Sequence, residues 1–225
     1  VPPLDARLTA IERMVPSCPC AADIGADHGF LGVHLLARGK CERVQFLDIS
    51  ASSLKKAARL VRRLGLEGRA DFAVGDGAQA LLYPAQAVVV AGMGGQTIAG
   101  IVERGAGRLA DSLLVLQPNV AIPELRLRLS RAGFCIVDED LARAGGRWYV
   151  VIAARKGRCE YSPEELCAGP VLIRKRHPGL AGYAQFRIRV TEKALAGAAK
   201  AEASAAVPLR EELDRWRAIE QWLRR

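Results

Sequence analysis

Residues 20–29 read CAADIGADHG, and this stretch decides the fold class. Small and apolar residues lead into an acid and a glycine, and a turn and a helical pattern follow. A buried parallel strand that leads through a glycine-containing loop into a helix has this composition. A second acid, Asp48, ends the next apolar run and follows Gly25 at roughly the offset at which an acid meets ribose hydroxyls. Together these features predict an adenosyl cofactor at the carboxyl edge of a parallel sheet.

The chain around this stretch alternates between strand and helix patterns. An N-terminal amphipathic helix is expected to stop at Pro16, and Ser50 is expected to cap the helix that follows Asp48. The expected strands are 20–24, 43–48, 70–74, 87–91 and 112–116, and the expected helices include 29–38, 51–64 and 121–132.

Two β-like runs close this region, 134–140 and 147–153, and Gly145–Gly146 between them predicts an antiparallel hairpin. Five βα units followed by an edge hairpin are typical of the Rossmann-like methyltransferase fold, an α/β fold with a mostly parallel seven-stranded sheet. A dinucleotide dehydrogenase is disfavoured because the glycines after the first strand have the wrong spacing for GxGxxG.

Residues 158–225 are expected to form a separate C-terminal α-helical, coiled-coil-like domain. Helices are predicted over 179–203 and 208–224, the second opening with Pro208 in its first turn. One apolar stripe follows the second helix at helical spacing and indicates helix–helix packing. Its members are Leu209, Leu213, Trp216, Ile219 and Leu223.

The net charge, the cysteine spacing and the length of the apolar runs indicate which kinds of partner to expect. The 225 residues carry a formal net charge of +9, which favours a polyanionic partner. Two basic clusters, residues 55–63 and 174–193, fit phosphate contacts, although solvated helix faces would look the same. The six cysteines contain no CxxC pair, so we expect reduced thiols and no metal. No apolar run reaches ~18 residues, so a monomeric cytoplasmic protein away from membranes is expected.

The acids at the strand ends suit the parts of S-adenosylmethionine. Asp23 and Asp27 suit an ammonium group, Asp48 offers two acceptor oxygens to ribose hydroxyls, and Asp76 is placed for an adenine amino group. Each acid could instead cap a helix or turn. After the fourth strand, residues 91–95 read AGMGG rather than Asp/Asn-Pro-Pro-aromatic, which argues against methylation of an exocyclic amino group.

Four segments closely resemble the bacterial tRNA (adenine-22-N1)-methyltransferase family. They are 22–29 (ADIGADHG), 75–77 (GDG), 91–95 (AGMGG) and 116–119 (LQPN), in order within roughly residues 5–157. The AGMGG and QPN blocks are the more specific ones, whereas many methyltransferases share the GDG block. The family also has a coiled-coil-like C-terminal domain, so the resemblance implies a methyltransferase domain over 1–157 and a helical domain over 158–225.

The resemblance implies methyl transfer from S-adenosylmethionine to N1 of an adenine in tRNA, with adenine 22 as the expected target. That nitrogen carries an in-plane lone pair and needs no deprotonation, so the enzyme's main task is alignment. Gln117 and Asn119 are expected to read the base edge, or else only to form a turn and a helix cap, and His28 to border donor or base, or else to be structural. The expected donor-binding residues are Asp23, Gly25, Asp27, His28, Gly29, Asp48, Ile49, Asp76, Gly77, Gly92 and Met93.

Two other functions remain open from the sequence. A small-molecule methyltransferase would share the donor site, although the net charge of +9 argues against it. A non-catalytic RNA-binding protein that kept the fold would bind the donor without transferring its methyl group.

Overall fold

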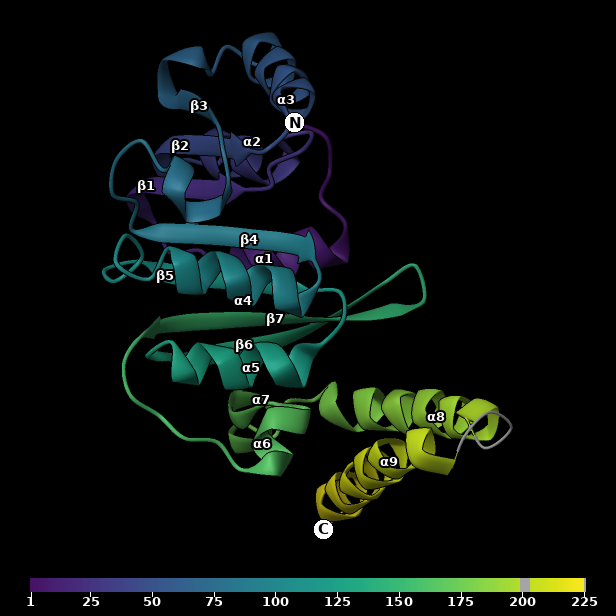
Figure 1. Ribbon diagram of the computed structural model, residues 1–225. Coiled ribbons are helices and arrows are strands. Elements are labelled where there is room, and N and C mark those ends of the chain that lie inside the picture. The colour runs from purple at the N-terminus through teal and green to yellow at the C-terminus, as the bar shows by residue number, and fades with distance from the viewer. Residues whose placement is uncertain (199–202, 225) are drawn as a thin grey trace. The chain divides into compact units, whose positions relative to one another are not determined.

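In the computed structural model, which describes residues 1–198 and 203–224, seven strands form one sheet in the order β3-β2-β1-β4-β5-β7-β6 (Figure 1). Strands β1 to β5 are parallel to one another, and β7 runs antiparallel to both β5 and β6. The expected fold is therefore confirmed. The strands are β1(Cys18–Ile24), β2(Cys41–Asp48), β3(Ala70–Val74), β4(Ala87–Met93), β5(Leu113–Pro118), β6(Phe134–Ala144) and β7(Arg147–Lys156).

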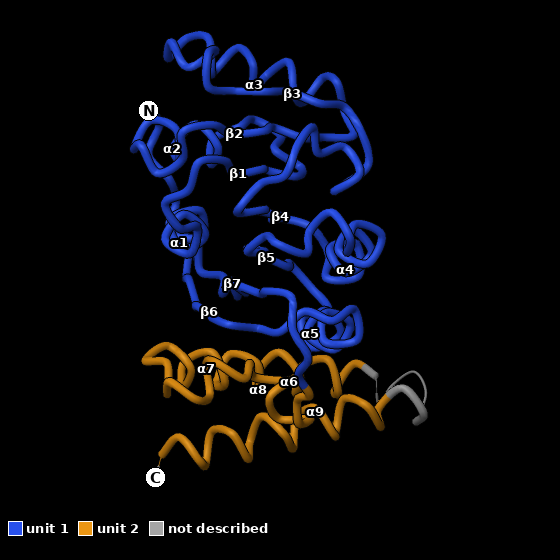
Figure 2. The backbone as a smooth tube through the Cα atoms, turned by 90° about the vertical axis from the view of Figure 1, so that its left-hand side faces the viewer, with its two compact units in different colours: residues 1–159 blue, residues 160–225 orange. Residues whose placement is uncertain are grey.

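Helices cover both faces of this sheet, which is why its central strands are apolar throughout. The core on one face joins α1, α2 and α3, whereas α4 and α5 pack together on the other face (Figure 2). The helices are α1(Ala6–Met14), α2(Phe30–Ala37), α3(Ala51–Arg63), α4(Gly95–Arg104) and α5(Ile122–Arg131), with short 3-10 helices η1(Glu67–Arg69) and η2(Gly77–Ala80).

Local sequence signals set several element boundaries. The Ser50 side chain accepts a hydrogen bond from the backbone N–H of Ser53 at 3.3 Å and so caps α3, as the sequence predicts. Gly145 and Gly146 both have positive φ, +56° and +76°, which the tight turn between β6 and β7 requires.

The structure divides into two compact units, residues 1–159 and 160–225 (Figure 2). The second contains α6(Pro163–Ala168), α7(Pro170–Arg174), α8(Leu180–Ala198) and α9(Ala203–Leu223). In α9, Leu213, Trp216 and Ile219 are buried, and the Trp216 ring meets Tyr183 of α8 edge-on at 5.4 Å. The apolar stripe therefore packs between the two long helices.

Three expectations for the second unit need correction or restriction. The last helix begins at Ala203, so Pro208 lies inside it rather than in its first turn. Helix α6 was not expected from the sequence, although Ser162 and Glu165 form a reciprocal capping box, which is a local signal for the start of a helix. Residues 199–202 of the expected 179–203 helix lie outside the described residues.

The expectation that all cysteines are reduced is wrong for one pair. Cys135 and Cys159 form a disulfide with their Cα atoms 5.6 Å apart. The hairpin makes this possible, because β7 returns along β6 and the N–H of Gly157 donates to the carbonyl of Gly133 at 2.9 Å. The two cysteines are 24 residues apart in the chain, so no local spacing pattern announces the pair.

Candidate active site

A cavity of about 760 Å³ lies at the carboxyl ends of β1 to β4. The strand order reverses direction at β1, which has β2 on one side and β4 on the other. Ligands of open α/β sheets bind at such a switch point, because the loops on its two sides diverge there. The cavity volume falls within the range of small-molecule sites, about 300–1,000 Å³.

The loop after β1 is a sharply bent wall of this cavity. Gly25, Asp27 and Gly29 all have positive φ, of +76°, +44° and +72°. The backbone N–H groups of Gly25 and Ala26 donate to the carbonyl of Leu47 at 2.7 and 3.1 Å, which ties the loop to the end of β2. A Cβ on Gly29 would lie 2.8 Å from the Cβ of Ala57, so this glycine lets the loop pack on α3.

Asp48 links two of the loops around the cavity. Its Oδ2 accepts a hydrogen bond from the N–H of Asp27 at 3.2 Å, and its Oδ1 accepts one from the N–H of Ser50 at 2.8 Å. Each carboxylate oxygen has a second lone pair. Since Asp48 also lines the cavity and is only half-buried, it retains the capacity to accept from a ligand's hydroxyl groups.

Asp23 lies deepest of the acids, with 5% of its surface exposed. Burial raises its pKa to about 7, a hydrogen bond from the backbone of Gly32 opposes the shift, and the charge of Asp48 adds to it. Gly32 belongs to the first turn of α2, where backbone N–H groups favour a negative charge. A cationic ligand group in the cavity would therefore stabilise the ionised form.

Asp76 directly precedes η2 on the opposite wall. Both of its carboxylate oxygens accept hydrogen bonds from Nη2 of Arg104, at 3.1 and 3.0 Å, and both side chains remain about half exposed. This ion pair fixes the carboxylate where β3 ends, while its remaining lone pairs stay available to a ligand.

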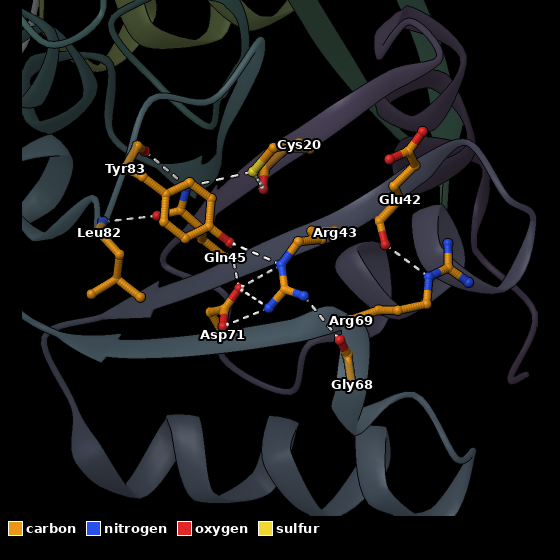
Figure 3. Close-up of polar contacts among 10 residues, drawn as sticks. Cys20, Glu42, Arg43, Gln45, Gly68, Arg69, Asp71, Leu82 and Tyr83 are labelled. Carbon is orange, nitrogen blue, oxygen red and sulfur yellow. Dashed lines mark hydrogen bonds and ion pairs between the residues drawn. The ribbon is translucent and has the colours of Figure 1, made fainter.

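A polar network on the sheet holds the segment that follows η2 (Figure 3). The buried Gln45 side chain donates to the carbonyl of Tyr83 at 2.9 Å and accepts from the N–H of Leu82 at 2.8 Å. Asp71 forms a two-oxygen ion pair with Arg43 and also accepts from the Tyr83 hydroxyl. These bonds anchor the chain that leaves η2, and with it the wall that carries Asp76.

The loops after β4 and β5 form one hydrogen-bonded rim. The N–H of Asn119 donates to the carbonyl of Met93 at 2.8 Å, and the Asn119 side chain donates to the carbonyl of Gly92 at 2.7 Å. A Cβ on Gly95 would lie 2.4 Å from the carbonyl oxygen of Ala121, so only glycine permits this approach. The AGMGG and QPN blocks, distant in sequence, are thus a single structural feature.

Gln117 is the centre of this rim and is fully buried. Its Oε1 accepts from Arg7 Nη1 at 2.9 Å and from the N–H of Gly92 at 3.2 Å. Its Nε2 donates to the carbonyl of Pro118 at 2.9 Å and to Oδ1 of Asn119 at 3.1 Å. Its amide is committed to protein partners, so the expectation that Gln117 reads a base edge needs revision to a positioning role.

Arg7 is the cavity residue that the sequence analysis missed. It comes from α1, lines the cavity, bonds to Gln117 and lies over the Tyr149 ring with 5.8 Å between its Cζ and the ring centroid. Nothing in its local sequence separates it from other basic residues on an amphipathic helix. Phe30 was missed too, although its position after His28 was visible: the two rings stack with centroids 5.6 Å apart at the cavity wall.

The cavity brings together most of the expected residues. Its walls include Asp23, Gly25, Asp27, His28, Asp48, Ile49, Asp76, Gly77, Gly92 and Met93. Gly29 lies beneath the loop against Ala57, and Gln117 and Asn119 lie behind and beside the Gly92 loop rather than in the wall. Gln117 is buried, whereas Asn119 is exposed.

Two further searches of residues 1–198 and 203–224 gave negative results. No helix in this part of the chain is long and apolar enough to cross a membrane. No group of three or more His, Cys, Asp or Glu side chains in the same part is arranged to hold a metal ion.

Comparisons with known proteins agree with this geometry. A family model described as a methyltransferase domain matches residues 4–152. The tRNA (adenine(22)-N(1))-methyltransferase of Bacillus subtilis is 31% identical over 156 residues, which cover 68% of this chain and 66% of the relative. A Mycoplasma pneumoniae protein, named as a candidate tRNA methyltransferase, is 33% identical over 158 residues, covering 67% of this chain and 71% of that protein.

Similarity to solved structures extends over nearly the whole chain. A Streptococcus pneumoniae protein crystallised in complex with S-adenosyl-L-methionine superposes with a TM-score of 0.85 at 26% identity. The superposition covers 95% of this chain and 98% of that one, whereas the curated sequence relatives match over about two thirds of their length.

The fold, the acid-lined cavity at the switch point and the matching family model define an S-adenosylmethionine-dependent methyltransferase. The side chains around the cavity fit this cofactor. They include carboxylates, and the cofactor offers an ammonium, a sulfonium and hydroxyl groups. Within that class, the chain belongs to the tRNA (adenine-22-N1)-methyltransferase family.

Proposed function

We propose that this protein transfers the methyl group of S-adenosylmethionine to N1 of adenine 22 in tRNA. The observation that carries the proposal is the rim made by the two most specific sequence blocks. Hydrogen bonds between Gly92, Met93, Gln117 and Asn119 join it at the edge of the acid-lined cavity. The donor cavity and the family's distinguishing residues thus occupy one edge of the sheet.

The proposed donor contacts follow from the chemistry of the wall. Asp48 accepts from the ribose hydroxyls, and Asp76 with Gly77 meets the adenine ring. Asp23, Gly25, Asp27 and His28 surround the amino-acid end, while Ile49, Gly92 and Met93 supply the apolar and backbone contacts. S-adenosylmethionine supplies an electrophilic methyl group when bound, and the protein's residues supply its orientation.

On the acceptor side, alignment is the proposed source of rate acceleration, because adenine N1 already has a lone pair to attack with. Asn119 is exposed and uses one amide hydrogen on Gly92, so its second hydrogen and a lone pair can hold a base edge. Gln117 fixes Asn119 and Gly92, and Arg7 fixes Gln117. The target base must leave its stack to reach this edge.

Mass spectrometry of nucleosides tests the proposal directly. Unmodified tRNA transcripts are incubated with the protein and isotope-labelled donor, digested, and analysed for labelled 1-methyladenosine. We expect label in a transcript with A22 and none in a matched transcript with G22. Label elsewhere in both transcripts contradicts the assigned position. Donor binding without any labelled nucleoside contradicts tRNA methylation and leaves a small-molecule enzyme or a non-catalytic RNA-binding protein.

The proposal also covers the state and place in which the enzyme acts. We propose a monomer that works in the cytoplasm, where its tRNA substrate is, and that needs no metal ion. Light scattering of the protein with and without tRNA measures the mass of the active species. Activity that survives exhaustive chelation supports the metal-free part, and activity restored only by an added divalent ion contradicts it.

A further inference from the structure

Helix α3 carries a strongly basic surface that the proposed chemistry does not use. Its 13 residues contain no acid and five cations, and all five side chains are exposed. We call this surface the α3 basic face, made by Lys55, Lys56, Arg59, Arg62 and Arg63. The opposite side of the helix, with Leu54, Ala57, Leu60 and Val61, is buried against the sheet.

The cations of the α3 basic face lack acidic partners. No ion pair or side-chain hydrogen bond of these five residues occurs among the described parts of the chain. Some other basic residues of the first unit do find partners: Arg43 pairs with Asp71, Arg104 with Asp76, and Arg128 with Glu103. Helix α3 differs from them in concentrating on one helix five exposed cations without such partners among the described residues.

Helix stability alone does not explain this composition. The helix dipole favours Arg62 and Arg63 in the last turn, but it gives no reason for the three cations further from that end. Lys55 and Arg59 stand four residues apart, as do Arg59 and Arg63, and like charges at this spacing repel each other on a helix. A bound polyanion would relieve that repulsion.

The α3 basic face begins beside the cavity. The cavity wall includes Ile49, just before α3, and Ser53, in the first turn of that helix. Lys56 follows Ser53 by three residues and therefore lies on the same side of the helix, one turn away. From Lys55 to Arg63 the helix rises about 12 Å, enough to meet more than one phosphate of a nucleic-acid strand.

The basic cluster of the second unit is a weaker candidate for the same role, because part of it is already used. Arg187 pairs with Glu212 of α9, and Arg176 lies over the Trp222 ring with 4.7 Å between its Cζ and the ring centroid. These contacts join helices within that unit. Such cations stabilise local packing, whereas those of α3 are available to a ligand.

We propose that the α3 basic face binds the ribose–phosphate backbone of the tRNA next to the target adenine, and so delivers that nucleotide to the cavity edge. The inference rests on the proposed function and names the surface that meets the substrate. Phosphate contacts position a nucleic acid without reading its sequence, which suits a surface of long, flexible cations.

A charge-matched pair of variants tests the inference. In the first, Lys55→Gln, Lys56→Gln, Arg59→Gln, Arg62→Gln and Arg63→Gln remove the α3 basic face. In the control, Arg13→Gln, Arg131→Gln, Arg147→Gln, Arg155→Gln and Arg158→Gln remove five exposed cations elsewhere in the first unit. Both lower the net charge equally, so a difference between them reports position and not total charge.

Binding of an A22 transcript is measured by filter retention at several salt concentrations, with donor affinity by calorimetry. We expect the α3 variant to lose at least about tenfold in tRNA affinity and the control much less. For the α3 variant, the slope of the logarithm of the tRNA binding constant against the logarithm of the salt concentration should become shallower by about 0.7–0.9 for each lost phosphate contact. Donor affinity should match the parent's in both. If thermal unfolding shows that the five-fold variant is not folded, the double variant Lys56→Gln/Arg59→Gln replaces it with a smaller expected loss.

Equal tRNA affinity and salt slope in the two variants would overturn the inference. An α3 variant that loses only its adsorption to vesicles of anionic lipid would overturn it in favour of a membrane surface. The outcome is separable from the proposed function. If the parent protein methylates no tRNA, the proposed function is refuted. If the parent methylates tRNA and both variants do so equally well, only the role of α3 is refuted.

Discussion

The loops after β1, β2 and β3 line the cavity, and the loop after β4 lines it with the β5 loop hydrogen-bonded beside it. The polar groups of these two sets of loops do different work. In the first set, Asp48 and Asp76 are tied into the protein by some lone pairs and face the cavity with others. In the second set, the Gln117 amide and the carbonyl of Gly92 are satisfied by protein partners. The first half of the site offers carboxylate lone pairs to a ligand, and the second is a rigid edge.

This difference suits the two substrates. The donor is small and carries hydroxyls and an ammonium that carboxylates recognise. The proposed acceptor is one base of a large RNA, whose affinity comes mostly from phosphates elsewhere. The residues that hold that base need a fixed position more than they need a high affinity for it, since alignment sets the rate.

The largest expected effect comes from breaking the rigid edge. Asn119→Ala removes the bond to Gly92 and the amide that we propose holds the base edge, so we expect the transfer step to slow by about 10²-fold. Single-turnover rates at saturating donor and tRNA measure this, with Gln96→Ala, an exposed amide on α4, as the control. A variant as fast as its parent would mean that Asn119 only closes the turn after β5.

The carboxylate half is broken most directly at Asp48. Asp48→Ala should weaken donor binding by roughly 1–3 kcal/mol, because charge-assisted bonds to two hydroxyls are lost. Calorimetry measures the loss, and Asp111→Ala, an exposed acid elsewhere in the same unit, is the control. Unchanged donor affinity would remove Asp48 from the site, whereas tRNA affinity is expected to stay constant in either case.

The raised pKa of Asp23 predicts a pH dependence of the same half. Since its pKa of about 7 in the folded state lies above the ordinary 3.8, folding favours the protonated form. Its contribution to stability is therefore full below about pH 4 and is lost as the pH rises through about 7. A cationic donor group prefers the ionised form, so donor affinity should fall by up to about tenfold per pH unit below 7. Calorimetry from pH 5.5 to 8.5 would contradict this if the profile were flat, or if Asp23→Asn kept the same profile.

A change at Arg7 is expected to have a smaller effect, because Arg7 contacts the rim through Gln117. Arg7→Met keeps the apolar stem but loses the hydrogen bond, which is worth about 0.5–1.5 kcal/mol, so we expect a decrease of a few fold in kcat. Steady-state kinetics with tRNA as the varied substrate separate kcat from KM, and Arg13→Met on the same helix is the control. A change in donor affinity larger than the change in kcat would place Arg7 in the donor half instead.

The sheet, its terminal hairpin and the acids at the strand ends could all be predicted from the amino-acid sequence. Strand periodicity, the Ser50 cap and the Gly145–Gly146 turn are local signals, so each can be read from a few neighbouring residues. The acid-rich loops follow from the same logic, because the carboxyl ends of parallel strands meet at one edge. The residues that line the first half of the cavity were accordingly predictable.

The second half of the site depends on long-range packing that no local sequence pattern predicts. Arg7 and Gln117 are 110 residues apart and meet where α1 packs beside β5, and the Cys135–Cys159 pair depends on the return of a hairpin. The Gln117 amide is buried and bonded to protein partners, and burial raises the pKa of Asp23. Side-chain type and spacing indicate which groups a residue can bond to. Its actual partner depends on which distant elements pack beside it.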